Sequence, residues 1–248
     1  MTSDSSAMPS IVLVHGAFAD ASGWTESITL LQQKGYTTYA PPNPLRSLPD
    51  DAAYIRAFVA TIEGPVVLVG HSYGGAVITN AATDVENVVA LVYINGFALD
   101  EGEPVIAAIG LGGGHSALAE HILPRPFPGA AEGDADAYID PAFFSELFCA
   151  DLPEADAAAL ASTQRPAAIS TLGQPSGVPA WRTIPSWYLV SSSDRTIPAE
   201  AERFMAERAG AKTVEIESSH VAMISHPGAV AELVDDAAKD AVKVRLAG

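Results

Sequence analysis

The sequence predicts an α/β fold in which a doubly wound, mostly parallel sheet carries helices on both faces. Three short runs rich in Val and Ile, at 11–14, 66–69 and 88–94, end in His, Gly or Asn, as buried parallel strands do. Segments with apolar residues at three- and four-residue spacing, typical of helices, separate them. Hydrophobic residues make up 48% of the 248 residues and charged residues 17%, which is enough apolar material for one large core.

The predicted elements alternate regularly through the first 95 residues. In order, they are a strand at 11–14, a helix at 22–34 with Gly35 as its C-cap, a strand at 36–40, a helix at 51–62, a strand at 66–69, a helix from Gly75 and a strand at 88–94. The helix at 51–62 has its apolar residues on one stripe, namely Ala52, Ile55, Phe58, Val59 and Ile62. Such alternation is typical of a doubly wound sheet.

The same alternation returns near the end of the chain. Strands at 187–190 and 214–216 complete the sheet. A helix opened by Pro198 separates them, and a final helix follows that is lined by Val230, Leu233, Val234 and Ala237. Residues 1–97 and 183–248 are therefore predicted to form the core. Residues 98–182 break the rhythm with many prolines, the run Gly110–Gly114 and helical pieces that begin near Pro141 and Pro153. We expect this segment to be an inserted helical cap over the ligand crevice of the sheet.

Charge and cysteine content narrow the classes of partner. The chain has 30 acidic and 13 basic residues, which gives a formal charge of −17. This charge repels nucleic acid and anionic membrane surfaces, so the expected partner is a small-molecule substrate. Cys149 is the single cysteine, and the start MTSDSSAMPS resembles no leader peptide, so we expect a cytoplasmic protein. Metal-ligand spacings are missing from the sequence, and no metal or cofactor is expected. The oligomeric state stays open, a homodimer included.

The pattern that carries chemistry is Gly70-His71-Ser72-Tyr73-Gly74, a G-x-S-x-G sequence between a predicted strand and a predicted helix. In this setting, small residues let the chain turn sharply, so that the serine hydroxyl stands out at the end of the strand. The N–H group of Tyr73 then faces a neighbouring oxyanion. Ser72 is therefore the candidate nucleophile.

A serine nucleophile needs a base and an acid that orients the base. Among six histidines, His220 alone follows the last predicted strand at its carboxyl end, whereas His15 and His71 lie in turns and are expected to make structural hydrogen bonds. Asp194 follows the preceding strand and is the predicted acid. An acid from the strand before the cap is the alternative, with Asp100, Glu101 and Glu103 as candidates.

The loop His15-Gly16-Ala17-Phe18 follows the first strand and predicts a second oxyanion donor, the N–H of Ala17. Aromatic residues near the strand ends and in the cap predict a largely apolar substrate pocket. Its expected members are Phe18, Phe97, Phe143, Phe144 and Trp181.

Four segments carry a family resemblance, namely HGAF, GHSYGG, SSSDRTIP and SSHVAMISHP. Through them the chain resembles the α/β-hydrolase superfamily from about residue 11 to 234. It is similar to the branch with bacterial esterases, plant methylesterases and hydroxynitrile lyases. The resemblance implies an eight-stranded sheet shortened at its start, a triad of Ser72, Asp194 and His220, and an oxyanion hole of Ala17 and Tyr73. Hydroxynitrile lyases have a threonine and a lysine where this chain has Gly16 and Val221, which favours hydrolysis over lyase activity.

We therefore predict a serine esterase that cleaves small carboxylic esters through an acyl-enzyme on Ser72. Lactones, amides and thioesters are alternative substrates for the same triad, and perhydrolysis is a possible side activity by resemblance to cofactor-free haloperoxidases. A ligand-binding receptor without catalysis, known among plant relatives of the fold, is the alternative from another class.

Overall fold

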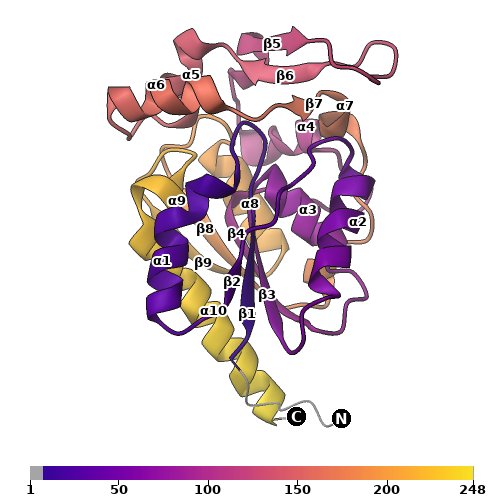
Figure 1. Ribbon diagram of the computed structural model, residues 1–248, viewed down its shortest axis with the longest axis vertical. Coiled ribbons are helices and arrows are strands. Elements are labelled where there is room, and N and C mark those ends of the chain that lie inside the picture. Colours follow the sequence, from indigo (N-terminus) through magenta and orange to yellow (C-terminus); the bar gives the residue numbers. More distant parts are fainter. Residues whose placement is uncertain (1–7, 248) are drawn as a thin grey trace.

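The structure, a computed structural model, describes residues 8–247 and has the predicted doubly wound α/β architecture (Figure 1). The prediction about a leader peptide falls largely on residues 1–7, which lie outside the described residues. The central sheet has six strands in the order β2-β1-β3-β4-β8-β9, and all neighbouring pairs are parallel. These strands are β1 (Ser10–Val14), β2 (Thr38–Tyr39), β3 (Val66–Ser72), β4 (Val88–Gly96), β8 (Ser186–Ser191) and β9 (Lys212–Ile216).

Helices cover both faces of the sheet. They are α1 (Thr25–Gln33), preceded by the 3₁₀ helix η1 (Ala21–Trp24), α2 (Leu48–Val59), α3 (Tyr73–Ala81), α8 (Ala199–Arg208), α9 (Ala222–Ser225) and α10 (Pro227–Ala247). Helices α1 and α10 pack together on one face, and α2 and α3 pack together on the other (Figure 1). This division follows from right-handed crossovers, because the chain moves outward from β1 to β2 and then returns toward β3. No helix among residues 8–247 is long and apolar enough to span a membrane.

Helix α2 shows how local sequence sets an element's bounds. The apolar stripe predicted a helix over 51–62, but α2 begins at Leu48 because the Ser47 hydroxyl accepts a hydrogen bond from Asp50 N–H at 3.1 Å. Pro49 fits this first turn, where its missing N–H would have no helical partner. The stripe of Ala52, Ile55 and Val59 is buried against the sheet, as expected.

Residues 98–182 lie at the end of the molecule where the parallel strands terminate (Figure 1). The predicted helices near Pro141 and Pro153 are present as α5 (Pro141–Phe148) and α6 (Glu154–Thr163). The segment also contains α4 (Val105–Ala108), η2 (Leu111–Gly113), η3 (Leu118–His121), α7 (Ser170–Gly173) and η4 (Ala180–Arg182). It is not purely helical, because β5 (Ile122–Arg125), β6 (Asp136–Ile139) and β7 (Ala167–Ala168) form an antiparallel sheet.

Candidate active site

Ser72 lies at a sharp turn between β3 and α3. Its backbone has φ 53° and ψ −125°, a conformation that costs a non-glycine residue about 1–3 kcal/mol. The turn is tight because a Cβ atom on Gly70 would lie 2.5 Å from the Gly74 carbonyl oxygen, and one on Gly74 would lie 2.3 Å from the Val14 carbonyl oxygen. The two glycines of the motif are therefore required by close backbone approach. The serine hydroxyl is presented at the carboxyl end of the sheet, on the wall of a cavity.

His220 and Asp194 form a buried pair beside this turn. His220 Nδ1 lies 2.5 Å from Asp194 Oδ2, and both side chains are fully buried. The other carboxylate oxygen, Asp194 Oδ1, accepts the backbone N–H groups of Thr196 at 2.7 Å and Ile197 at 2.9 Å. Because an ionised carboxylate only accepts hydrogen bonds, His220 carries its proton on Nδ1 and leaves Nε2 as a free acceptor. Nε2 has no hydrogen-bond partner among the described residues, so it is available to take a proton.

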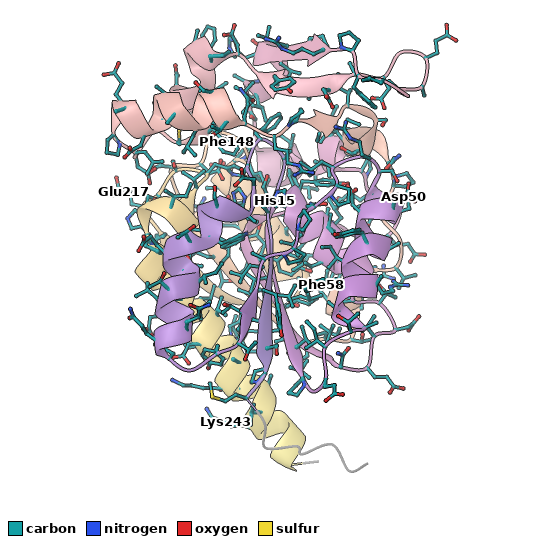
Figure 2. The ribbon with its side chains drawn as sticks, viewed as in Figure 1. His15, Asp50, Phe58, Phe148, Glu217 and Lys243 are labelled. Carbon is teal, nitrogen blue, oxygen red and sulfur yellow. The ribbon has the colours of Figure 1, made fainter. Side chains whose placement is uncertain are left out.

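His71, the residue before Ser72, fixes the position of the His220 main chain. Its Nε2 donates to the His220 carbonyl oxygen at 2.8 Å, and the two rings lie 4.7 Å apart between centroids. Burial lowers the pKa of His71 well below its ordinary value, so this histidine is neutral. The ring of Phe148 packs on His220 at 5.1 Å. Figure 2 shows Phe148 and His15 at the end of the sheet that faces residues 98–182.

The loop after β1 lies directly against the Ser72 turn. A Cβ atom on Gly16 would lie 2.6 Å from Ser72 Cβ and 3.1 Å from Tyr73 N, so only glycine allows this approach. Phe18 has φ 62° and donates its N–H to the Arg165 carbonyl oxygen at 2.7 Å. The loop that carries Gly16 and Ala17 is thereby packed against Tyr73, the first residue of α3. Two N–H groups that converge on one point can stabilise an oxyanion, and Ala17 and Tyr73 are the predicted donors.

His15 makes hydrogen bonds that hold the start of this loop, which is the structural role predicted for it. Its Nε2 accepts the Asn43 N–H at 3.0 Å, and its carbonyl oxygen accepts from the Asn43 side chain at 2.9 Å. Burial is the main cause that lowers the pKa of His15, and a neutral ring is needed for Nε2 to accept. The loop that carries Gly16 and Ala17 is therefore tied to the chain that follows β2.

A cavity of about 550 Å³ lies between the Ser72 turn and residues 98–182, and its wall is mostly apolar. Ala17, Phe18, Ser72, Tyr73 and Phe97 line its floor. The 98–182 segment supplies most of the remaining wall, including Val105, Ile106, Ile109, Leu118, Ala119, Ile122, Pro124, Ala137, Ile169 and Leu172. Among the described residues, no Asp, Glu, Lys or Arg lines this cavity; His115, Ser116 and Thr196 are its polar side chains besides Ser72 and Tyr73.

Residues 11–233 match the family model described as the alpha/beta hydrolase family. The chain belongs to this family. It is 24% identical to the alpha/beta hydrolase nvfD of Aspergillus novofumigatus over 95% of this chain and 99% of that protein. It is 30% identical to the carbendazim hydrolyzing esterase of a Nocardioides species over 49% of this chain and 61% of that protein. The fold is similar to that of a pyrethroid hydrolase from Sphingobium faniae, with a TM-score of 0.78 and 22% identity over 94% and 98% of the two chains.

The structure of this alpha/beta hydrolase corrects part of the predicted pocket. Phe18 and Phe97 line the cavity, but Phe143, Phe144 and Trp181 do not. Phe144 is fully buried and packs on Phe148, whereas Phe143 is 36% exposed and stacks on His121. Trp181 donates its Nε1–H to the Leu99 carbonyl oxygen at 2.9 Å. Phe143, Phe144 and Trp181 thus contact residues of their own segment, and the cavity wall is largely aliphatic.

The alternative acids of the hydrolase lie in ion pairs away from His220. Asp100 and Glu101 bind the Arg182 guanidinium at 2.6 Å and 2.9 Å. Glu103 binds Arg208 at 2.7 Å. Of the predicted acids, only Asp194 is in contact with His220 among the described residues.

Two carboxylates near the His220 loop were not predicted. Asp151, which follows α5, accepts hydrogen bonds from Ser219 N–H at 2.9 Å, Ser219 Oγ at 2.5 Å and Ser218 Oγ at 3.2 Å. Glu202 lies fully buried in α8. The sequence does contain a signal for Glu202. This residue precedes the buried residues Met205 and Ala206 by three and four positions, so it lies on the buried stripe of α8. Asp151 has no such signal, since its partners are close only in space.

Proposed function

We propose that this alpha/beta hydrolase is a serine esterase that cleaves neutral carboxylic esters through an acyl-enzyme on Ser72. The observation that carries the proposal is the buried His220–Asp194 pair, with a free Nε2, beside a strained serine turn on the wall of an apolar cavity. A serine hydroxyl is a weak nucleophile, and it is activated when such an imidazole accepts its proton.

The proposed mechanism has two acyl-transfer steps. In the first, His220 Nε2 takes the proton of Ser72 as the hydroxyl oxygen attacks the ester carbonyl, and the N–H groups of Ala17 and Tyr73 stabilise the oxyanion. The imidazolium then gives its proton to the departing alcohol. In the second step His220 activates a water molecule that releases the acid from Ser72. Asp194 stabilises the imidazolium in both steps.

The proposed substrates are uncharged esters with a bulky apolar part. A site without Asp, Glu, Lys or Arg in its described wall offers no ion pair to a charged substrate, which would lose its hydration on entry. The cavity of about 550 Å³ has room for much more than an acetyl group. The similarity to a carbendazim hydrolyzing esterase, 30% identical over 49% of this chain, supports the ester class. We further propose that residues 98–182 act as the cap of this cavity.

The test is hydrolysis of p-nitrophenyl esters from acetate to decanoate by wild type and Ser72→Ala side by side. We expect the wild type to prefer medium acyl chains over acetate and the variant to lose at least about 10³-fold in kcat/KM. A matched control is Ser116→Ala, which removes another hydroxyl from the cavity wall. Full activity of Ser72→Ala would refute the mechanism. If the wild type is inactive but a fluorophosphonate labels Ser72, lactones, amides and thioesters are tested next. Without labelling, the receptor function is favoured.

A further inference from the structure

Glu202 is a buried carboxyl group that the proposed mechanism does not use. It lies on α8, directly behind the loop that carries Asp194, and is fully buried. Its Oε2 accepts the Ser191 N–H at 3.0 Å, and its Oε1 accepts no hydrogen bond from the described residues. A buried carboxyl oxygen without a donor is costly if it is charged.

Glu202 and Asp194 are held by the same residue. Ser191 donates its N–H to Glu202, and its carbonyl oxygen accepts the Asp194 N–H at 3.2 Å. Asp194 accepts three donors, from Thr196, Ile197 and His220, whereas Glu202 accepts one. Two neighbouring buried carboxyl groups cannot both be ionised at low cost, so they share one proton. The carboxyl group with fewer donors keeps that proton, which is Glu202.

The surroundings of Glu202 favour its neutral form. Burial, and next the negative charge of Asp194, raise the pKa of Glu202 well above its ordinary range. Tyr188 on β8 is also fully buried, and burial is the main cause that raises its pKa, so it is neutral as well. The nearby cation, Arg203, extends to Glu215, with contacts of 2.6 Å and 2.9 Å.

Asn95, at the end of β4, completes the cluster. It is fully buried with φ 46°, and its amide makes no well-formed hydrogen bond with the described residues. It still lies near enough to Glu202 to lower the carboxyl pKa slightly, against the larger effects of burial and of Asp194. Among the described residues, the cluster therefore offers Glu202 the neutral groups of Tyr188 and Asn95 and one carboxylate, that of Asp194.

We propose that Glu202 is a positioning residue that stays protonated and donates a hydrogen bond to Asp194, holding that carboxylate against His220 Nδ1. The proposal rests on the proposed triad. The donated hydrogen bond holds the Asp194 carboxylate on the side that points away from His220. It also withdraws part of the negative charge of the carboxylate, so that the His220 imidazolium is stabilised less strongly. Glu202 would thus set the basicity of His220 without touching substrate.

The test compares wild type with Glu202→Gln and Glu202→Leu. Gln keeps an N–H donor and a carbonyl acceptor in the same shape, whereas Leu removes both. We expect kcat/KM of Glu202→Gln to stay within about threefold of wild type and that of Glu202→Leu to fall by at least about tenfold. The acid limb of kcat/KM, which reports the free enzyme's base, should stay in place for Gln and move up by about 0.5–1 pH unit for Leu.

A direct readout is the infrared difference spectrum between wild type and Glu202→Gln at pH 7. We expect the C=O band of a protonated carboxyl group to be present in wild type and lost in the variant. The proposal is overturned if this band is missing, if both variants move the acid limb equally, or if Glu202→Leu lowers only the melting temperature. These results are independent of the esterase proposal, which fails on Ser72→Ala, because the infrared band requires no turnover.

Discussion

At the scale of single residues, the site depends on which groups carry protons. His220 holds a proton on Nδ1 because Asp194 Oδ2, at 2.5 Å, can only accept when it is ionised. His71 is neutral and donates from Nε2 to the His220 carbonyl oxygen. Each of these two histidines therefore has one tautomer. His71 Nδ1 and His220 Nε2 both lack a partner among the described residues, and His220 is the candidate base because its other nitrogen is held by the Asp194 carboxylate.

Asp194→Asn tests this tautomer. Asn can keep the hydrogen bonds from Thr196 and Ile197 through its oxygen, but it then presents an NH₂ group to His220 Nδ1. His220 would have to accept there and carry its proton on Nε2, where it cannot deprotonate Ser72. We expect kcat/KM to fall about 10³- to 10⁴-fold with little change in melting temperature.

The matched control for this variant is Asp100→Asn, which removes the same charge from a surface pair with Arg182. Its kcat/KM should stay close to that of wild type. If Asp100→Asn loses activity and Asp194→Asn does not, the acid of this hydrolase is on the strand before residues 98–182.

At the scale of elements, the loop between β9 and α9 is held from both sides. The core supplies the hydrogen bond from His71 to the His220 carbonyl oxygen. Residues 98–182 supply Asp151, which binds Ser218 and Ser219 just ahead of His220. The position of His220 thus depends on two parts of the chain that are distant in sequence.

Asp151→Ala is expected to lower the free energy of unfolding by about 1–2 kcal/mol at neutral pH, because charge-assisted hydrogen bonds are lost. Burial opposes ionisation of Asp151, but hydrogen bonds from the side chain and N–H of Ser219 outweigh it and lower the pKa. A lowered pKa in the folded state means that the stabilisation is complete above the unfolded pKa of about 3.9 and disappears as pH falls through the folded pKa.

The measurement is urea unfolding of wild type and Asp151→Ala from pH 7 to pH 2.5. The difference between the two should be largest above about pH 5 and shrink below pH 4. Glu132→Ala, an exposed acid in the same segment, is the control and should show no such difference. A difference that is constant with pH would mean that packing, and not the carboxylate, stabilises the loop.

How far the sequence predicts these features depends on whether a residue acts locally. Ser72 and its two glycines were predictable because the turn that needs them is five residues long. The doubly wound sheet was predictable from the alternation of strands and helices, and Asp194 and His220 from their places after strands. The cavity wall could not be predicted, since the inward side of residues 98–182 is set by packing; Phe144 and Trp181 turned out to contact their own segment or its junction.

At the scale of the whole molecule, the dominant feature is its excess of negative charge. The formal charge is −17, and pairs such as Arg203–Glu215 and Lys212–Asp240 place cations beside only some of the acids. The remaining carboxylates repel one another, and salt screens that repulsion. We expect the melting temperature to rise by a few degrees between about 10 mM and 150 mM sodium chloride.

Choline chloride at the same ionic strength is the control, because it screens charge without specific sodium binding. An equal rise in both salts supports general repulsion. A fall in melting temperature would mean that the surface ion pairs contribute more than the repulsion they offset.

The contact between Phe18 N–H and the Arg165 carbonyl oxygen has a consequence for how such an enzyme can diversify. It joins the loop over the nucleophile to residues 98–182 through main-chain atoms on both sides. Every amino acid carries a carbonyl oxygen, so residue 165 is free to change its side chain while the bond persists. Substitutions that reshape the cavity can therefore accumulate in that segment during evolution without loosening the loop beneath it.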